Sequence, residues 1–295
     1  MSRTGLAIRA LRLTLSGAKA DPTPDYDVAS TSYDDYFTEH MGQHSMGMLD
    51  EVNIKPGDTV VELACGTGHL TAEIARRLEG SGTLKVVDIS AGMLEVARRK
   101  VRPSADLQLQ LSQGDMAQFL RAQPSSSADL VVIGWAICYS QPVRLLRDVM
   151  RVLRPGGQVA IIETRSTALA GLRDAFETVV ADDPSMMTAM IRVSLPRSAS
   201  TVGRWFKKAG LAPIAIREGE QQLPCTTAAQ ALEWVERSGA GAGFRDSFDV
   251  QRQDEIRQRL AVALESTATV NGRIDLRHTF VVGVARREAV QPVSV

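Results

Sequence analysis

The sequence predicts an α/β fold, with one mostly parallel sheet and helices on both of its faces. From about residue 58 to residue 164, short apolar runs alternate with segments in which apolar residues recur three and four positions apart. This alternation is typical of parallel strands joined by crossover helices. A glycine-rich turn follows the first run. With 295 residues, of which 44% are hydrophobic and 23% charged, the chain can bury the core of an ordinary globular enzyme.

The predicted strands are five apolar runs, which cover residues 59–63, 84–87, 107–111, 130–133 and 158–162. Three helix-period segments lie between them, at residues 70–78, 93–101 and 143–153. Their apolar residues form the stripe that a helix needs in order to cover a sheet. Pro155, Gly156 and Gly157 are expected to end the third helix and turn the chain into the fifth strand.

The regular alternation ends after Arg165. The next 35 or so residues, up to about residue 200, are predicted to form a helical insertion over the site, and they include Met186, Met187, Met190 and Ile191. Beyond the insertion, helices are predicted at residues 202–209, 228–237 and 254–264, and strands at residues 212–217 and 273–285.

The composition indicates a small-molecule partner. The 34 Lys and Arg residues balance the 34 Asp and Glu residues, so the chain has no net positive field that would concentrate nucleic acid. Cys65, Cys138 and Cys225 are odd in number and too far apart for a zinc site, so we expect no metal and the reduced thiols of a cytoplasmic protein. No apolar run approaches the roughly 18 residues of a membrane span.

The N-terminal segment is basic, because it contains Arg3, Arg9, Arg12 and Lys19 before its first acid. Arg9 and Arg12 interrupt the apolar region that a signal peptide requires, so we do not expect secretion. The apolar residues lie near helical spacing, which leaves two interpretations open. One is an amphipathic helix that docks on the body of the protein or on a membrane surface, and the other is a frayed basic terminus.

The sharpest signal is the run VVELACGTGHLT at residues 60–71, in which an apolar strand leads into a glycine-rich turn and then a helix. Backbone N–H groups converge at the positive end of such a helix, and glycine is needed because a Cβ atom would block the ligand. Asp88 ends the next apolar run, 20 residues after Gly68, where its carboxylate can accept both hydroxyls of a ribose. Taken alone, these two features also describe a nicotinamide-binding site.

Three details favour S-adenosylmethionine (SAM) over a nicotinamide cofactor. Thr71 stands where a dinucleotide fingerprint has its third glycine. Glu62 ends the first strand as an acid, which suits a cationic amino group and does not suit a pyrophosphate. SAM has such an amino group and no phosphate. Asp115 and Met116 follow the third run and offer an acid and an apolar neighbour for the edge and the face of an adenine.

The stretch at residues 62–157 resembles the class I SAM-dependent methyltransferases, and within them the ubiquinone/menaquinone-biosynthesis-like group. The residues that match the group's cofactor motifs are Glu62, Gly66, Gly68, Asp88 and Asp115. The group's Leu-(Arg/Lys)-Pro-Gly-Gly turn is present at residues 153–157. The resemblance covers residues 45–165 well and residues 200–285 loosely.

The resemblance implies a Rossmann-like seven-stranded, mostly parallel sheet with its last strand antiparallel and a helical lid insertion. The substrate site would lie above the carboxyl ends of strands one, four and five. The implied parts of the chain are a basic segment and tyrosine-rich lid (1–45), a SAM-binding domain (46–165), a helical insertion (166–200) and the C-terminal half of the sheet with its helices (201–295).

The predicted cofactor is SAM. The residues predicted to contact it are Glu62, Ala64, Gly66, Gly68, Asp88, Ile89, Met93, Asp115, Met116 and Ile133. Two interpretations of Met93 stay open, because a methionine at helical spacing either covers the adenine or belongs to the core.

The catalytic residues are less well defined. Residues 134–139, GWAICY, stand where the group often has a pair of histidines, so no general base can be carried over. The candidates are Trp135 and Tyr139 in this stretch and Tyr36 in the tyrosine-rich segment. Tyr36 and its neighbours either close over SAM, with a ring facing the sulfonium, or only seat the following helix. His40, His44 and His69 are further candidates for a base, because histidine titrates near neutral pH.

The predicted function is in-line methyl transfer from SAM to a small apolar or aromatic metabolite, a reaction that depends more on positioning than on acid catalysis. Three alternatives stay open. One is an enzyme of the same fold that attacks the aminobutyrate chain of SAM and releases methylthioadenosine. The others are an NAD(P)-dependent oxidoreductase and a non-catalytic SAM-binding module.

Overall fold

The computed structural model describes residues 3–102, 104, 106–243 and 245–289. The chain forms two compact units, each made of three stretches of sequence. Unit 1 comprises Met1–His40, Thr167–Arg192 and Glu220–Thr279, and unit 2 comprises Met41–Ser166, Val193–Gly219 and Phe280–Val295. All the predicted cofactor residues lie in unit 2.

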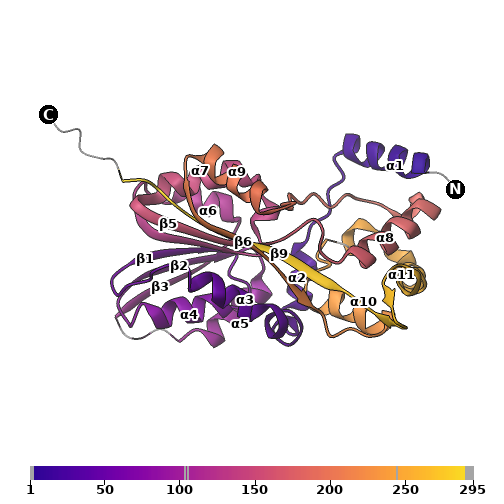
Figure 1. The fold of residues 1–295 in the computed structure, drawn as a ribbon, viewed down its shortest axis with the longest axis horizontal. Helices are drawn as coiled ribbons and strands as arrows, with labels where there is room; N and C mark the ends of the chain where they lie inside the picture. Colours follow the sequence, from indigo (N-terminus) through magenta and orange to yellow (C-terminus); the bar gives the residue numbers. More distant parts are fainter. Residues whose placement is uncertain (1–2, 103, 105, 244, 290–295) are drawn as a thin grey trace. The chain divides into compact units, whose positions relative to one another are not determined.

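A seven-stranded sheet forms the centre of unit 2, which confirms the predicted fold class (Figure 1). The strands lie in the order β3-β2-β1-β4-β5-β9-β6. Neighbours among β1 to β5 are parallel, and β9 runs antiparallel to β5. The strands are β1 (Thr59–Leu63), β2 (Gly82–Asp88), β3 (Leu107–Gln113), β4 (Ala128–Gly134), β5 (Leu153–Thr164), β6 (Ala212–Gln222) and β9 (Arg277–Arg286).

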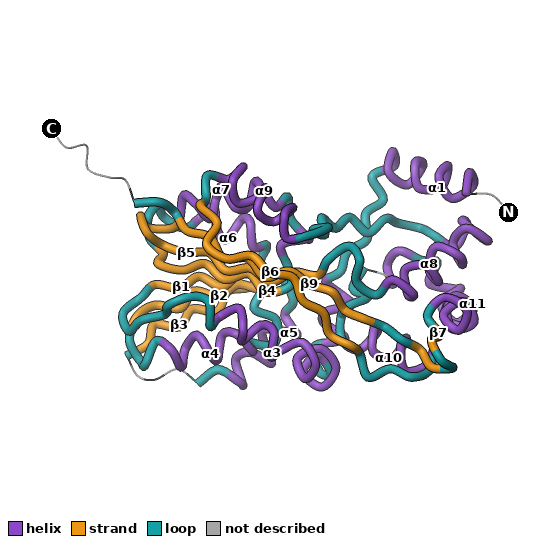
Figure 2. Tube along the Cα trace, in the orientation of Figure 1, coloured by secondary structure: helices purple, strands orange, loops and turns teal. Residues whose placement is uncertain are grey.

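Helices cover both faces of this sheet, as Figure 2 shows, with α3, α4 and α5 on one side and α6, α7 and α9 on the other. Their bounds are α3 (Glu39–Leu49), α4 (His69–Arg77), α5 (Ala91–Lys100), α6 (Met116–Ala122), α7 (Pro142–Val152) and α9 (Ala199–Ala209). Central strands that are buried on both faces need apolar side chains at every position. Val131, Val132 and Ile133 of β4 are accordingly fully buried.

The predicted glycine turn at residues 155–157 lies inside the bounds of β5 and not before it. Leu153 already pairs with Ala128, and the register between the two strands then shifts before Gln158 pairs with Leu130. The predicted start of the fifth strand at residue 158 is therefore wrong, because β5 begins at Leu153. Continuous pairing with β4 does begin at Gln158. Glycine tolerates the backbone that such an irregularity requires.

Unit 1 is mainly helical. Its helices are α1 (Arg3–Ser16), α2 (Thr23–Ala29), the π-helix η1 (Asp34–Thr38), α8 (Ala170–Asp182), α10 (Ala228–Arg237) and α11 (Gln253–Thr267), and its 3-10 turns are η3 (Pro184–Met186), η4 (Arg245–Ser247) and η5 (Val250–Arg252). A Cβ atom on Gly171 of α8 would lie 2.5 Å from that of Ala268, so this glycine permits the close approach of α8 and the end of α11. In the insertion, Met186 and Met187 are buried.

The single strand predicted at residues 273–285 is two strands in the structure. Arg273–Ile274 forms β8, which pairs with β7 (Thr269–Val270) in a two-stranded hairpin, and β9 begins afterwards. Asn271 and Gly272 at the hairpin turn both have positive φ, 51° and 75°. The dipeptide Asn-Gly is the strongest short sequence signal for a hairpin. The residues after it alternate between apolar and polar, and this alternation led to the prediction of one strand.

The basic N-terminal segment is helical over α1 and docks on unit 1. The guanidinium of Arg9 donates two hydrogen bonds to the carbonyl oxygen of Met187, at 2.6 and 2.9 Å, and Leu13 is buried. Leu11 and Leu15 on the opposite face are 59% and 78% exposed. In the described part of the chain, no helix is both long and apolar enough to cross a membrane.

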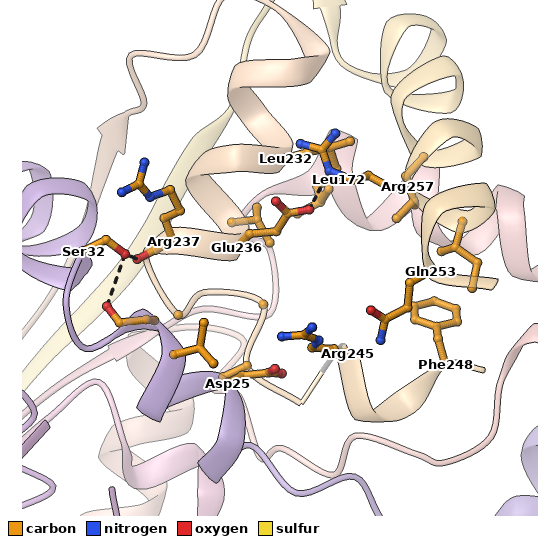
Figure 3. Close-up of a pocket in the computed structure, with 18 of the residues that line it drawn as sticks. Asp25, Ser32, Leu172, Leu232, Glu236, Arg237, Arg245, Phe248, Gln253 and Arg257 are labelled. Carbon is orange, nitrogen blue, oxygen red and sulfur yellow. Dashed lines mark hydrogen bonds and ion pairs between the residues drawn. The ribbon is translucent and has the colours of Figure 1, made fainter. Parts of the chain in front are cut away.

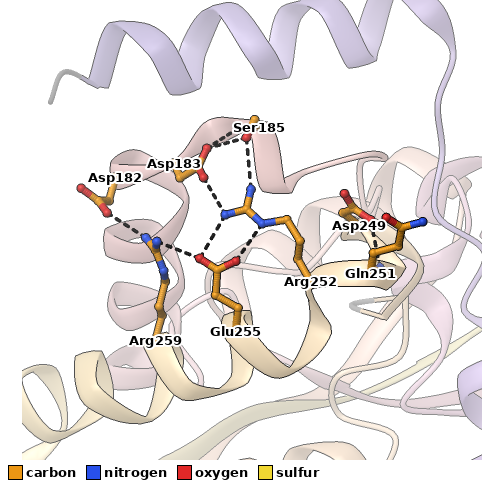
Figure 4. Close-up of polar contacts among 8 residues, drawn as sticks. All are labelled: Asp182, Asp183, Ser185, Asp249, Gln251, Arg252, Glu255 and Arg259. Carbon is orange, nitrogen blue, oxygen red and sulfur yellow. Dashed lines mark hydrogen bonds and ion pairs between the residues drawn. The ribbon is translucent and has the colours of Figure 1, made fainter.

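An ion-pair network joins the end of α8 to the start of α11 (Figure 4). Arg252 contacts Asp183 at 2.8 Å and Glu255 at 2.9 Å, and Arg259 contacts Glu255 at 2.8 Å and Asp182 at 2.9 Å. The Ser185 hydroxyl and the Arg252 guanidinium lower the pKa of Asp183 to about 2. Exposed ion pairs each stabilise a protein by about 1 kcal/mol at most, so the network defines the geometry of unit 1 more than its stability.

Candidate functional site

The candidate site begins where β1 ends. Parallel strands bring their carboxyl ends to one edge of the sheet, and the turn at residues 64–68 leads from that edge into α4. Ala64, Gly66 and Gly68 have φ values of 56°, 55° and 80°, so three residues of the five are left-handed. The N–H groups of Cys65 and Gly66 donate to the Val87 carbonyl oxygen and to Asp88, and the N–H of Gly68 donates to the carbonyl oxygen of Cys65, so contacts within the protein fix the turn.

The two glycines of the turn serve different needs. A Cβ atom on Gly66 would meet no atom within 4 Å, so the space beside this residue is open. A Cβ atom on Gly68 would lie 3.0 Å from that of Ala97, so the absence of a side chain at Gly68 permits close packing of the turn against α5. Gly66 is therefore the glycine with room for a ligand at its side chain position.

Asp88 ties this turn to the end of β2. One of its carboxylate oxygens accepts a hydrogen bond from the backbone N–H of Gly66 at 2.8 Å, and the other accepts from the N–H of Ser90 at 2.9 Å. The side chain is 7% exposed. A carboxylate oxygen can accept two hydrogen bonds, so these contacts leave Asp88 able to accept from the hydroxyls of a ribose as well. The sequence predicted the ribose contact, but it did not predict the hydrogen bonds from Gly66 and Ser90 to Asp88.

Glu62 is a buried carboxyl group at the carboxyl end of β1. It is 1% exposed, and its Oε2 atom has no hydrogen-bond partner among the described residues. Burial raises the pKa of Glu62 to about 8; the Thr71 hydroxyl lowers this pKa and the negative charge of Asp88 raises it. A buried acid of this kind is stabilised by a cation placed beside it.

The raised pKa of Glu62 predicts a loss of stability as the pH rises. A carboxyl group with a pKa of 4.5 in the unfolded chain and about 8 in the folded protein contributes fully below pH 4.5 and loses that contribution as the pH rises through 8. We expect the free energy of unfolding to fall by about 4 kcal/mol between pH 5 and pH 8. Urea unfolding of the ligand-free protein between about pH 5 and pH 8 measures it, because ordinary carboxyl groups are already ionised in that range.

Glu62→Gln is the matched variant, since it keeps the size of the side chain and cannot titrate. We expect its unfolding free energy to change less over the same range of pH. The burial of Glu163, which raises the pKa of that group to about 7, should leave a smaller residual slope. An equal slope in the parent protein and in Glu62→Gln would show that Glu62 is ionised at neutral pH.

The residues predicted for the adenine lie at the ends of β2 and β3. Asp115 caps α6 by accepting a hydrogen bond from the N–H of Gln118 at 2.8 Å. Ile89 is 46% exposed, which is unusual for an isoleucine beside a sheet edge and leaves an apolar surface available. Met93 is 2% exposed and Ile133 is fully buried, and the predicted cofactor contacts of both residues stay predictions.

A cavity of about 200 Å³ brings three of the predicted site residues together. Asp115 and Met116 line it from the start of α6, and Tyr139 lines it from the turn after β4. The guanidinium-bearing residues Arg121 and Arg144 also line this cavity. The structure thus joins the predicted adenine-side residues to one of the predicted catalytic candidates.

The turn after β4 is held in a strained conformation. Trp135 has φ 58°, and its N–H donates to the carbonyl oxygen of Ile162 at 2.8 Å. Its indole N–H donates to the Ser45 hydroxyl at 2.8 Å, and its ring meets the edge of Phe280 at 5.8 Å between centroids. A bulky residue with positive φ costs about 1 to 3 kcal/mol, which these contacts offset.

Glu163, at the end of β5, braces the same turn and was missed by the sequence reasoning. Its carboxylate accepts hydrogen bonds from the N–H of Cys138 at 3.0 Å and from the N–H of Thr164 at 2.7 Å. The side chain is 1% exposed, and burial raises its pKa to about 7. An acid at the end of an apolar run had identified Glu62, and the same signal was present at residues 159–163.

Tyr36 lies in unit 1, whereas Trp135 and Tyr139 lie in unit 2. The Tyr36 hydroxyl donates to Glu233 at 2.7 Å, which raises the pKa of Tyr36. The guanidinium of Arg237 stands 4.6 Å from the centre of the ring. The cation over the Tyr36 ring in this structure is therefore Arg237.

Two of the histidines considered as bases have identified neighbours. The ring of His44 packs on Phe280 at 4.5 Å, and His69 Nε2 lies 3.4 Å from the carbonyl oxygen of Gly42. The three cysteines are buried, and burial raises the pKa of Cys65 and of Cys138 well above the usual value. Neutral, buried thiols are poor nucleophiles.

Comparison with known proteins gives one family model, which matches residues 29–195 and is described as the ubiE/COQ5 methyltransferase family. The matched segment is more than half of the chain and contains every predicted cofactor residue.

Curated relatives include demethylmenaquinone methyltransferases of several bacteria. That of Symbiobacterium thermophilum is 39% identical over 117 residues, which are 38% of this chain and 45% of that protein. That of Lysinibacillus sphaericus is 30% identical over 141 residues, 48% of this chain and 58% of that protein. The chain thus spans about half the length of these relatives.

Solved structures share the fold at low identity. A protein of Bacillus halodurans described as a methyltransferase superposes with a TM-score of 0.55 at 16% identity, covering 83% of this chain and 98% of that one. The YcgJ protein of Bacillus subtilis superposes with a TM-score of 0.53 at 18% identity, covering 84% of this chain and 100% of that one. These matches show a common fold.

Proposed function

The chain belongs to the ubiE/COQ5 methyltransferase family of class I SAM-dependent methyltransferases, and from this premise we propose that it methylates a quinone-like small molecule. SAM is its cofactor, as the sequence predicted. The proposed acceptor is an aromatic ring of the naphthoquinol type, bound at the carboxyl edge of the sheet beside the turn after β4.

Two observations carry the proposal, which are the buried Glu62 carboxyl at the end of β1 and the open space beside Gly66 in the turn that follows. An acid with an oxygen that lacks a hydrogen-bond partner suits the ammonium group of SAM, and the open space suits its approach. When bound, SAM supplies a methyl group made electrophilic by the positive sulfur. The residue set of the site therefore fits this cofactor.

We assign the remaining contacts by position. Asp88 would accept the ribose hydroxyls while it keeps the turn in place, and Asp115 would accept from the adenine edge. The exposed side chain of Ile89 would cover the adenine face. None of these residues has to move a proton. Holding reactants in line can lower a barrier by roughly 7 to 11 kcal/mol, which explains how a site without an evident acid–base pair can work.

The acceptor class rests on the relatives and on the turn after β4. The curated relatives cited above are named for demethylmenaquinone, an aromatic quinone. Trp135 and Tyr139 would supply apolar and aromatic contacts at the substrate side, and Glu163 would fix the turn that carries them through the N–H of Cys138. Apolar sites with a few fixed polar groups are typical of small-molecule binding.

We expect methyl transfer to 1,4-naphthoquinol with formation of S-adenosylhomocysteine, measured by liquid chromatography and mass spectrometry. Methylated quinol and S-adenosylhomocysteine should appear in equal amounts, because one methyl group leaves each SAM. SAM alone should give neither product. The matched control is 2,3-dimethyl-1,4-naphthoquinol, whose quinol ring has no free carbon and should not be methylated.

Two outcomes would contradict the proposal. Release of methylthioadenosine from SAM alone would show attack on the aminobutyrate chain and remove the methyltransferase assignment. Equal turnover of the blocked quinol would show transfer to oxygen and remove the ring carbon as the acceptor.

A further inference from the structure

Unit 1 contains a cavity of its own that the proposed methyl transfer does not use. Its volume is about 580 Å³, within the range of about 300 to 1,000 Å³ that is typical of small-molecule sites. The walls come from α2, α8, α10, α11 and the loop between α10 and α11, all of which belong to unit 1. Figure 3 shows these walls around the cavity.

Much of the lining is apolar. The apolar residues that face the cavity are Val28, Ala29, Leu172, Leu232, Val235, Ala242, Phe248, Ile256 and Leu260. Val28 lines the cavity and is 63% exposed. An apolar lining of this extent favours a ligand with an apolar body.

Most of the charged groups around the cavity already have partners within unit 1. Glu236 pairs with Arg257 at 2.9 Å (Figure 3), and Arg237 pairs with Glu233 at 3.3 Å. The carboxylate of Asp25 accepts a hydrogen bond from the backbone N–H of Gly243 at 2.8 Å. Of the three arginines that line the cavity, Arg237 and Arg257 therefore have acidic partners.

Arg245 is the exception. Within the part of the chain that the structure describes, its guanidinium takes part in no salt bridge and no side-chain hydrogen bond. It acts on Asp25 through its charge, which lowers the pKa of that group, while burial raises the same pKa more strongly. In Figure 3, Arg245 lies between Asp25 and Gln253 at the cavity. Both Arg245 and Gln253 can donate hydrogen bonds to one anionic group.

We propose that this cavity binds an amphipathic carboxylate, a small molecule with one carboxylate group on an apolar body. Arg245 would hold the carboxylate in a fork of two hydrogen bonds, with Gln253 as a further donor. The apolar body would lie against Leu232, Phe248 and Ile256. The residues that line the cavity belong to unit 1 and the predicted cofactor residues to unit 2, and the binding test below requires no methyl transfer.

A cationic ligand is disfavoured by the same contacts. Glu236 is neutralised by Arg257, and Asp25 is held by a backbone N–H and faces the positive charge of Arg245. The remaining acid, Asp254, is exposed in the first turn of α11, where the positive end of the helix stabilises it. A neutral ligand would gain no charge interaction with Arg245, whose side chain is exposed to solvent.

The experiment uses decanoate as the probe and decanamide as its neutral analogue, with affinities for the full chain measured by calorimetry. Arg245→Gln should weaken decanoate binding about tenfold or more, because a hydrogen-bonded charge is lost. It should leave the affinity for decanamide unchanged. Val28→Trp should weaken both ligands, since the larger ring occupies the cavity from a position that is already exposed.

Val250→Trp is the matched control, because Val250 is 74% exposed in the same unit and does not line the cavity. It should leave both affinities unchanged. Equal decanoate affinity in the parent protein and in Arg245→Gln would overturn the proposal. So would the absence of saturable decanoate binding, or an equal loss of decanamide binding in Arg245→Gln.

Discussion

Gly66→Val is expected to abolish SAM binding, with a loss of affinity of about a hundredfold or more. Among the described residues, no atom lies within 4 Å of the position that a Cβ atom on Gly66 would take. A branched side chain would occupy the space that the proposed cofactor needs. The variant should still fold, because the left-handed backbone with φ 55° costs valine only about 1 to 2 kcal/mol.

Gly57→Val separates occlusion of the site from backbone strain. Gly57 has φ 88°, its Cβ position also meets nothing within 4 Å, and it lies in the turn before β1, at the opposite end of that strand. Both variants should lose a similar amount of stability in urea, but calorimetry should show loss of SAM binding for Gly66→Val alone. Normal SAM affinity in Gly66→Val would remove this glycine from the cofactor site.

The fold was largely predictable because its signals are local and repeated. The parallel strands β1, β2, β4 and β5 contain apolar runs, and the helices between the strands carry stripes of apolar residues. The antiparallel last strand and the strand count came from the family resemblance, since neither has a local signal. The β7–β8 hairpin was missed although Asn271-Gly272 announced it, because the residues after it alternate like one strand.

The cofactor was predictable from the chemistry of a few positions. Thr71 in place of a third glycine and the acid Glu62 before the turn favoured SAM over a dinucleotide, and family membership confirms SAM as the cofactor. The contacts of the individual site residues stay predictions. The structure shows that Met93 and Ile133 have buried side chains, which periodicity alone could not distinguish from ligand contact.

The features that the sequence did not reveal depend on contacts between distant residues. Gly68 looks like Gly66 in the motif, and only the approach of Ala97 separates their roles. Glu163 reaches the N–H of Cys138, 25 residues earlier in the chain. The cavity of unit 1 is lined from three separate stretches of sequence, so no local pattern announces it.

Asp88→Ala is expected to weaken SAM binding about a hundredfold and also to destabilise the protein. The carboxylate is the proposed acceptor for the ribose hydroxyls, and a hydrogen bond to a charged group contributes about 1.5 to 3 kcal/mol. Alanine also removes the acceptors of the Gly66 and Ser90 N–H groups, which are 2.8 and 2.9 Å from the carboxylate. The turn that carries Gly66 should therefore lose its position as well, and the unfolding free energy should fall by about 2 kcal/mol.

Asp129→Ala provides the matched control for this loss. Asp129 also accepts a backbone hydrogen bond within the sheet, from the N–H of Thr59 at 2.8 Å, and it pairs with Arg154. Thr59 begins β1, so Asp129 lies at the opposite edge from the cofactor turn. Urea unfolding should show that both variants are destabilised, and calorimetry should show normal SAM affinity in Asp129→Ala alone. If Asp88→Ala loses stability but binds SAM as the parent protein does, then Asp88 supports the turn and does not contact the ribose.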